Sequence, residues 1–424
     1  MIWPMIPCAR LWRGHLHRKS ETQGVIIALV WLAGLGAAAQ FGKISVALAE
    51  FRALYPVGEV ALGLLISCVG TVGLLFGVIG GALLARIGIR RAMVLGLVSA
   101  AVLSAMQALL PPFEVMIALR LLEGASHLAI VIAGPILMAR HSSDAARPAV
   151  MTLWSAFFGV SYMLIALIAP LLIQTVALGG YLLAHSGWMI VLAALLHIAL
   201  PPPAPKPAGR ARDAGPGPDH PSIDLSPRAW IGLHVRIYRS PWLSAAALGF
   251  VCYTVLYIAL LTYLPEFAAR SSRSSLSAAM SFVSILTSLT FGIWLLTKLP
   301  SVRAVQVGFA ITAVTALGLV PLHETAAFGF AAIAVMGATG FIPGASFAAL
   351  TDLTQTDEDR SLATGALAQM GNVGTTSGPP LLAAIVSFSG LEGLLMFILV
   401  FCAAGIGLHT HLIARRTAIM AAKD

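Results

Sequence analysis

Charged residues are scarce in this chain, since only 10% of its 424 residues are Asp, Glu, Lys or Arg while 58% are hydrophobic. Soluble globular domains carry about 25% charged residues. The composition therefore excludes an ordinary soluble protein and predicts a protein that crosses a membrane many times. The net charge of +9 indicates no nucleic-acid partner, because the basic residues follow the distribution that membrane topology requires.

Cysteine is also rare, and Cys8, Cys68, Cys252 and Cys402 are far apart, without CxxC or metal-ligand spacing. Three of the four fall in apolar segments, which predicts buried, inert thiols. The chain contains no GxxxxGK[ST], HExxH or GxSxG motif, so neither a nucleotide site nor a hydrolytic site is indicated. We therefore expect no enzyme, no cofactor and no metal site.

Long apolar runs, in contrast, are frequent. Windows of about 20 apolar residues, the length that spans a bilayer, predict twelve transmembrane helices in an all-α protein. The first six are residues 25–46, 60–84, 92–110, 113–139, 150–172 and 182–200, and the second six are residues 242–264, 276–299, 304–322, 326–350, 362–388 and 391–413. Glycines and a proline in the tenth, Gly337, Gly340, Pro343 and Gly344, predict a bend or break there.

The predicted helices form two groups with three connecting or terminal regions. The division is a tail at 1–24, a six-helix bundle at 25–200, a linker at 201–241, a second bundle at 242–413 and a tail at 414–424. The linker begins PPPAPKPAGRARDAGPGPDHP, a composition that predicts disorder over its first half. The basic N-terminus lacks a short apolar core before a cleavage site, so it is expected to be a tail.

Lysine and arginine predict the orientation. If the N-terminus is inside, 21 of the 26 lie on the inner side, three (Arg52, Arg270 and Arg273) on the outer side, and Lys43 and Arg120 within spans. This asymmetry predicts a multi-pass protein of the cytoplasmic (inner) membrane, with both termini cytoplasmic and lipid as its surroundings.

Residues 113–139 are apolar enough to cross the bilayer, yet they carry Arg120, Glu123 and His127. Separations of three, four and seven residues place these side chains on one helix face. A charged group at the centre of a membrane helix costs about 2.5–3.5 kcal/mol on insertion scales. The stripe is therefore expected to face either a protein interior or a water-filled cavity.

Several motifs resemble those of the major facilitator superfamily. The segment GALLARIGIRR, residues 81–91, resembles the inter-helix signature, with matches at Gly81, Arg86, Gly88, Arg90 and Arg91 and with Ala85 where the family has an acidic residue. The segment Arg120-Leu-Leu-Glu-Gly124-Ala-Ser126 resembles the family's RxxxGxG element, with Ser126 where the second glycine usually stands. Ala169-Pro170 departs from the Gly-Pro of the drug/proton antiporters, and GNVGTTSGPP at 371–380 resembles the glycine-proline punctuation of the eleventh span.

The resemblance implies two pseudo-symmetric six-helix bundles around a central cavity lined by spans one, four, seven and ten. Candidate solute-binding residues on this plan are Gln40, Lys43, Arg120, His127, Tyr253, Tyr257 and Asn372. Each also has a structural interpretation: Arg120 and Glu123 could form an internal pair, Lys43 could extend to the interface, and the others could pack helices. The conformational signature comprises Gly81, Arg86, Gly88, Arg90, Arg91 and Gly124.

The favoured hypothesis is a secondary transporter, acting as a monomer, that moves a small organic or inorganic anion by alternating access. Lys43 and Arg120 against Glu123 leave one positive charge, which favours an anion, and Glu123 with His127 could couple transport to protons. As a whole the chain is similar to bacterial cyanate- and nitrate-permease-like importers, without a diagnostic motif for either. The alternatives are a drug or metabolite exporter of the same fold, acting as a proton antiporter, and a non-transporting receptor or integral-membrane enzyme.

Overall fold

The computed structural model describes residues 8–143, 146, 150–151, 153–154, 156–201 and 226–422, and every regular element in these ranges is a helix. We call residues 8–201 the N-terminal segment and residues 226–422 the C-terminal segment. The N-terminal segment contains α1 (Cys8–Val46), α2 (Leu48–Leu54), α3 (Glu59–Ser67), α4 (Gly70–Ile87), α5 (Ile89–Gln107), α6 (Phe113–Arg140) and α8 (Phe157–Ala199). The C-terminal segment contains α9 (Pro227–Arg239), α10 (Ala245–Tyr263), η1 (Leu264–Phe267), η2 (Arg270–Ser272), α11 (Arg273–Thr287), η3 (Ser288–Gly292), α12 (Ile293–Leu296), α13 (Ser301–Ala316), α14 (Phe328–Thr339), α15 (Phe341–Leu353) and α16 (Asp357–Ala421).

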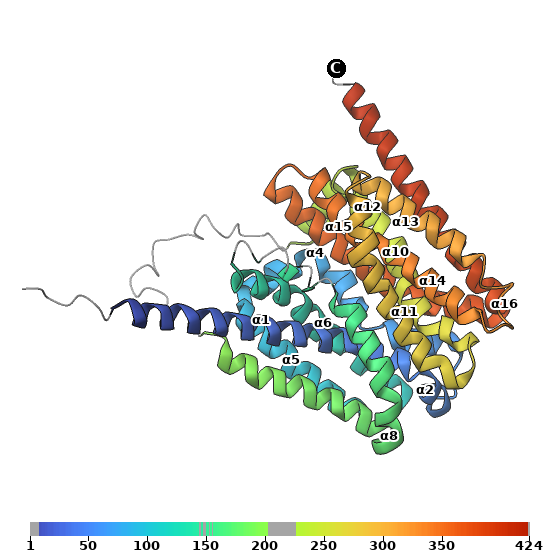
Figure 1. Ribbon diagram of the computed structural model, residues 1–424, viewed down its shortest axis with the longest axis horizontal. Helices are drawn as coiled ribbons and strands as arrows, with labels where there is room; N and C mark the ends of the chain where they lie inside the picture. The colour runs from blue at the N-terminus through green and yellow to red at the C-terminus, as the bar shows by residue number, and fades with distance from the viewer. Residues whose placement is uncertain are drawn as a thin grey trace, which may run out of the picture.

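Eight helical stretches of the described residues are long and apolar enough to cross a membrane, or nine when the bent pair α3–α4 counts as one span. This count does not reach the twelve spans expected from the sequence. Two of the eight are very long, and each contains one non-helical residue, Ala177 in α8 and Gly390 in α16. At about 1.5 Å per residue, the 43 residues of α8 exceed one bilayer thickness, and Figure 1 shows α8 turning back on itself at its label.

Local sequence explains where several helices start and stop. Gly88, between α4 and α5, has φ = 90°, a conformation that only glycine adopts without strain. Ser226 and Thr356 cap α9 and α16 by accepting main-chain N–H bonds from Ala229 and Asp359, as such residues do at helix N-termini. In the tenth span, where a bend or break is predicted, one residue, Gly340, separates α14 from α15, and residues 328–353 still form one stretch long enough to cross a membrane.

The two segments pack against each other along several helices. In Figure 1 the blue-to-green helices lie together, beside the yellow-to-red helices. One cluster of buried apolar side chains includes members of both segments, such as Phe41 and Leu256. Between α1 and α10, the hydroxyl oxygens of Ser45 and Thr262 lie 2.5 Å apart. The core is therefore continuous across the boundary between the segments.

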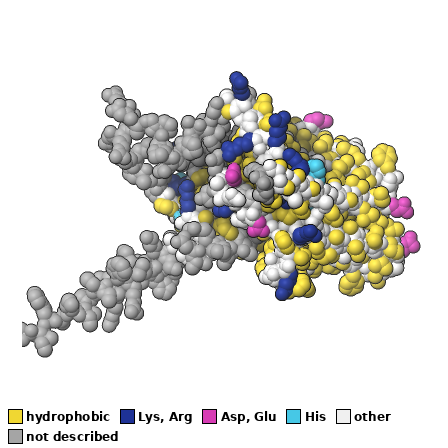
Figure 2. Space-filling model, turned by 90° about the horizontal axis from the view of Figure 1, so that it is seen from above, with side chains coloured by type: hydrophobic (Ala, Val, Ile, Leu, Met, Phe, Trp, Pro, Cys, Tyr) yellow, Lys and Arg dark blue, Asp and Glu magenta, His cyan; other side chains and the backbone are white. Residues whose placement is uncertain are grey.

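Large apolar side chains also cover much of the outer surface. Phe388 is 90% exposed, Phe330 76% and Leu171 65%. Figure 2 shows a broad apolar surface, with Lys and Arg atoms gathered toward the grey residues and with Asp and Glu atoms both among them and at the far edge. An apolar exterior of this kind belongs in lipid, so the structure is that of an all-helical, multi-pass membrane protein.

Two predicted boundaries differ from the observed helices. Helix α1 begins at Cys8, within the predicted tail 1–24, and α16 continues to Ala421, within the predicted tail 414–424. Both differences have the same cause. A search for windows of apolar residues finds the part of a helix that can lie in the bilayer, but it does not detect a polar extension of the same helix. The first half of the linker 201–241, for which disorder is predicted, lies outside the described residues except for Pro201. Cys68, Cys252 and Cys402 are buried and free, as predicted.

Candidate functional site

The carboxylate of Glu123, on α6, is the centre of a buried ionic cluster. Its Oε1 accepts a hydrogen bond from Lys43 Nζ of α1 at 2.8 Å, and its Oε2 accepts bonds from Arg120 Nη1 at 2.5 Å and Gln107 Nε2 at 2.9 Å. Lys43 is 1% exposed, and Arg120 and Glu123 are fully buried. The cluster thus joins three helices of the N-terminal segment through one carboxylate.

Arg120 also bonds to the break between α3 and α4. These two helices are bent by 48°, and the last carbonyls of a helix have no partner within it. Arg120 donates from Nε to the Leu65 carbonyl and from Nη2 to the Ile66 carbonyl, each at 3.0 Å. The guanidinium group therefore satisfies the end of α3 and holds it against α6.

Gly124 follows Arg120 by one helical turn, and its lack of a side chain allows α6 to approach the same break. A Cβ at this position would lie 2.5 Å from the Val69 carbonyl oxygen. The RxxxG spacing noted in the sequence thus has a physical explanation: the arginine binds the freed carbonyls, and the glycine permits the contact.

The ammonium group of Lys43 also bonds to a group of polar residues that the sequence did not indicate as a site. Its Nζ donates to Ser104 Oγ at 3.0 Å, and this hydroxyl lies 3.0 Å from His185 Nδ1 and from the Leu182 carbonyl. His185 Nε2 lies 3.0 Å from the Gly36 carbonyl. We define the Glu123 cluster as Lys43, Ser104, Gln107, Arg120, Glu123 and His185. The sequence gives only one indication of Ser104, Gln107 and His185: each is a polar residue within an apolar segment.

Gln40 and His127 adjoin the Glu123 cluster without contacting its carboxylate. Gln40 Nε2 donates to Ser126 Oγ at 2.9 Å, and Ser126 donates to the main-chain oxygen of Glu123 at 2.7 Å. His127 Nδ1 lies 3.0 Å from the Ala37 carbonyl and 3.2 Å from Gln40 Oε1. These contacts do not include the direct hydrogen bond between Glu123 and His127 that a proton transfer between them would need. Instead, hydrogen bonds connect His127 through Gln40 and Ser126 to the main-chain oxygen of Glu123.

The remaining candidate solute contacts lie in the C-terminal segment. Tyr253 and Tyr257 of α10 are both 7% exposed, and their ring centroids are 5.3 Å apart. A Cβ at Gly159 of α8 would lie 3.4 Å from the Tyr257 hydroxyl, so this hydroxyl faces the N-terminal segment. Asn372 of α16 is half-buried and donates to the Ala368 carbonyl at 2.8 Å. No hydrogen bond connects these three residues with the Glu123 cluster among the contacts of the described residues.

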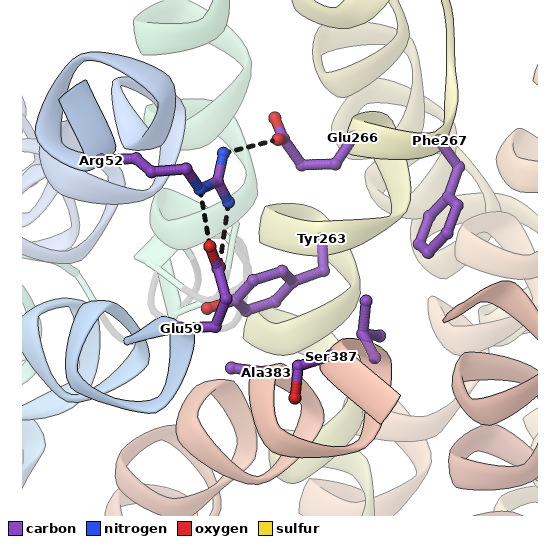
Figure 3. A pocket seen from close by; sticks show the side chains of 8 residues that line it. Arg52, Glu59, Tyr263, Glu266, Phe267, Ala383 and Ser387 are labelled. Atoms are coloured by element: carbon purple, nitrogen blue, oxygen red, sulfur yellow. Dashed lines mark hydrogen bonds and ion pairs between the residues drawn. The ribbon is translucent and has the colours of Figure 1, made fainter. Parts of the chain in front are cut away.

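A pocket opens between the segments at the end of the molecule where α2 lies, which we call the α2 end. Figure 3 shows Arg52 reaching toward Glu59 and Glu266, with Tyr263, Phe267, Ala383 and Ser387 around the cavity. Arg52 Nε and Nη2 bind both oxygens of Glu59 at 2.8 and 3.0 Å, and Nη1 binds Glu266 Oε2 at 3.0 Å. The hydrogen bonds from Arg52, above all those to Glu59, raise the pKa of its guanidinium.

Arg273 completes this ion-pair group. Its Nη1 binds Glu266 Oε1 at 2.9 Å, so each oxygen of Glu266 holds a different arginine. Two arginines and two carboxylates then balance in charge. The group joins α2 and α3 of the N-terminal segment to η1 and α11 of the C-terminal segment, and closes the α2 end.

At the opposite end, where α9 lies, uncharged hydrogen bonds join the two segments, while the ion pair of Arg236 with Asp359 lies within the C-terminal segment. Gln369 of α16 donates from Nε2 to the Leu74 carbonyl of α4 and to His234 Nε2, both at 3.0 Å. Tyr238 of α9 donates to Gln369 Oε1 at 2.7 Å. Gln369 thus ties together α4, α9 and α16, and we call this end the α9 end.

The inter-helix signature lies at the α9 end as well. Arg90 donates from Nε to the Leu200 carbonyl at 3.1 Å and from Nη2 to the His197 carbonyl at 2.7 Å, which binds the end of α8. Arg91 is exposed. Gly81 and Arg86 lie in α4, where only their main chain is described.

The part of the chain that the structure describes contains no group of three or more His, Cys, Asp or Glu side chains placed to hold a metal ion. Its polar groups are arranged as ion pairs and hydrogen bonds between helices. Their chemistry suits charge compensation within a membrane and reversible contacts between the two segments.

A family of known proteins matches this chain. Residues 26–344, more than half of the 424-residue chain, match the Major Facilitator Superfamily. A search of curated proteins returned no match. The match extends across both segments and includes the Glu123 cluster and the α2-end pair of Arg52 and Glu266. The chain therefore belongs to the Major Facilitator Superfamily and is a secondary transporter of small-molecule solutes.

Proposed function

We propose that this transporter moves a small anion and couples that movement to protons. The observation that carries the proposal is the charge of the Glu123 cluster, in which Lys43 and Arg120 face a single carboxylate. One positive charge is left in a membrane interior, where an uncompensated ion is costly. A solute anion that reached this cluster would neutralise the excess charge.

The contacts of Lys43 support it as the residue that meets the solute. Arg120 already binds Glu123 and two main-chain carbonyls. Lys43 donates to Glu123 and Ser104, and an ammonium group has three donors. The third donor of Lys43 would be available to an anion that reached the cluster. Gln40, His127, Tyr253, Tyr257 and Asn372 remain our candidates for the rest of the binding site.

Alternating access requires closures that can break. The α2 end is held by ion pairs at half-buried side chains, which contribute about 0–1 kcal/mol each. The α9 end is held by the neutral hydrogen bonds of Gln369, each worth about 0.5–1.5 kcal/mol. Closures of this size suit a protein in which each end opens in turn.

Glu123 is our candidate proton carrier. Its carboxylate oxygens bind side chains of α1, α5 and α6, and through Arg120 it is connected to α3. A proton on Glu123 would remove the negative charge that holds Lys43 and Arg120. Protonation would thereby loosen contacts among four helices at once, which is the kind of change that can couple a proton to a conformational step.

We further propose twelve spans in two bundles, with α8 dividing at Ala177 and α16 at Gly390, both termini cytoplasmic and the protein monomeric in the inner membrane. The gathering of Lys and Arg at one side of Figure 2 supports the orientation, since basic residues accumulate on the cytoplasmic side. The cyanate/nitrate-like subgroup remains a prediction from the sequence.

A thermal-shift screen of the purified full-length chain tests the solute class. Anions would be compared with neutral and cationic analogues of the same size. A ligand at 100 times its Kd stabilises the folded state by about 2.7 kcal/mol. We expect an anion to raise Tm in the wild type and in Arg270→Gln, an exposed control at the α2 end, but not in Lys43→Gln. Stabilisation by a cation or neutral analogue alone, or full retention in Lys43→Gln, would contradict the proposal.

Uptake into proteoliposomes tests whether transport is coupled to protons and whether the solute is imported or exported. We expect pH-driven accumulation of the anion to be lost in Glu123→Gln, while exchange of labelled for unlabelled solute, which needs no gradient, is retained. Accumulation that persists in Glu123→Gln would reject the role of Glu123. Proton-driven extrusion of a drug-like compound in place of anion uptake would favour the exporter alternative.

A further inference from the structure

Helix α9, which precedes the first span of the C-terminal segment, has two chemically different faces. One face contacts the protein: Ile237 is fully buried, and Tyr238 and His234 bind Gln369. The other face is exposed, with Ile231 at 55% and Val235 at 44%. At about 100° per residue, Ile231 and Val235 lie about 120° and 160° from the buried Ile237, and Tyr238 lies at the boundary between the two faces.

Two basic side chains lie beside this exposed apolar pair. Arg228 and Arg239 are both exposed, and on a helical wheel they lie within about 80° of Ile231. The sequence of α9, PRAWIGLHVRIYR, contains no acidic residue. The exposed face of α9 therefore combines β-branched apolar side chains with positive charge and has no carboxylate of its own.

The position of α9 places this face near the ends of the membrane spans. Ile237 packs in a cluster with Val302 of α13, Leu350 of α15 and Ala246 of α10, all close to a terminus of their helix. Only residues 240–244 separate α9 from α10, and Arg416 Nη1 binds the Pro241 carbonyl at 2.8 Å in this connection. Helix α9 thus lies at the level where spans enter the lipid headgroups.

We infer that the exposed face of α9 binds the membrane surface and that its arginines take the anionic headgroups of phospholipids. A basic amphipathic helix at headgroup depth buries its apolar side chains at the acyl boundary and attracts negative lipid. In water, the apolar side chains of Ile231 and Val235 would stay hydrated, and the favourable free energy of burying them would be lost. This inference concerns lipid and does not depend on which solute the transporter carries.

Spin labels on the full-length protein in vesicles of phosphatidylglycerol and phosphatidylethanolamine test the depth of α9. The label is attached through Val235→Cys, or through Thr417→Cys on an exposed site near the end of α16, in a Cys8→Ser background. The other three cysteines are buried. We expect the ratio of oxygen accessibility to water-soluble nickel-complex accessibility to be several-fold higher at position 235 than at 417.

Two results would overturn the inference. Equal nickel access at positions 235 and 417 would place the face in water. Poor access of both reagents to position 235 would mean that another part of the chain, such as residues 202–225, covers the face.

Binding of anionic headgroups by Arg228 and Arg239 is tested separately, by measuring Tm in different phospholipids. We expect replacement of phosphatidylcholine by phosphatidylglycerol to raise Tm of the wild type and of the control Arg270→Gln. The double variant Arg228→Gln/Arg239→Gln should lose most of that rise while keeping its Tm in phosphatidylcholine. An equal rise in the double variant would contradict anionic headgroup binding, whatever the outcome of the solute screen.

Discussion

The guanidinium group of Arg52, in the N-terminal segment, lies 3.0 Å from a carboxylate oxygen of Glu266, in the C-terminal segment. Glu266 binds Arg273 with its other oxygen, and Arg52 binds Glu59 with its other nitrogens. This single contact therefore connects two ion pairs that each lie within one segment. Its rupture would remove the ionic link between the segments at the α2 end without leaving any of the four charges unpaired.

Arg52→Gln should therefore open the α2 end while changing stability little. Half-buried ion pairs contribute about 0–1 kcal/mol, so Tm should fall only slightly. Ala383 lines the same pocket and is 1% exposed, and we expect a membrane-impermeant thiol reagent to label Ala383→Cys several-fold faster when Arg52→Gln is present. Arg270→Gln, an exposed arginine at the same end, should leave the labelling rate unchanged. Equal rates in all three backgrounds would show that Arg52 does not close the pocket.

Glu123→Gln should destabilise the protein strongly. The substitution leaves Lys43 and Arg120 buried without their counter-ion, and breaking a buried pair costs about 3–5 kcal/mol. The measurement is chemical unfolding in detergent. Glu114→Gln changes an exposed carboxylate on the same helix and should cost less than about 1 kcal/mol.

A second cluster variant separates lost charge pairing from a general loss of packing. Lys43→Met/Glu123→Gln removes one charge of each sign, so the double variant should be less destabilised than the sum of the two single variants by about 0.5–3 kcal/mol. Simple additivity would mean that Lys43 and Glu123 do not interact energetically, despite their 2.8 Å separation.

The sequence predicted the shared face of Arg120, Glu123 and His127 correctly because helical periodicity is local. All three are buried in α6, and the protein interior, one of the two expected environments, surrounds them. The cluster partners Ser104, Gln107 and His185 could not be predicted in the same way. Which turn of α5 or α8 meets Glu123 depends on how far each helix slides along α6, and packing of whole helices sets that displacement.

The ends of the molecule show a similar limit. Nothing in the sequence connects Arg52 with Glu266, because 214 positions separate them along the chain. The bonds of the Gln369 amide to α4 and α9 could not be predicted either, because they follow only from the tertiary arrangement. Motif spacing thus predicted the family and one helix face, whereas contacts between the segments required the fold.

Gly63→Ala should disturb the contact between α3 and α16. A Cβ at Gly63 would lie 2.6 Å from the Pro380 Cα and 2.8 Å from its nitrogen. These are main-chain atoms that cannot rotate away, so we expect a loss of about 1–3 kcal/mol in unfolding free energy. Gly187→Ala is the matched control, because a Cβ at Gly187 meets nothing within 4 Å. That change should stabilise helix α8 by about 0.5–1 kcal/mol. Equal effects of the two substitutions would contradict the close approach at Gly63.

Tyr238→Phe should weaken the closure at the α9 end and flatten its alkaline pH dependence. Burial raises the pKa of Tyr238 from 10.0 to about 12, so the folded protein holds this proton more tightly than the unfolded chain does. The resulting stability is fully present below pH 10 and is lost as the pH rises through about 12. The difference in Tm between wild type and Tyr238→Phe should therefore be constant from pH 7 to about 9.5 and should shrink above pH 10.

The hydroxyl of Tyr238 donates to Gln369, and its loss should lower the free energy of unfolding by about 0.5–1.5 kcal/mol at neutral pH. A difference that stayed constant to pH 12 would mean that Tyr238 titrates alike in both states, and hence that its hydroxyl is not held in the contact among α4, α9 and α16.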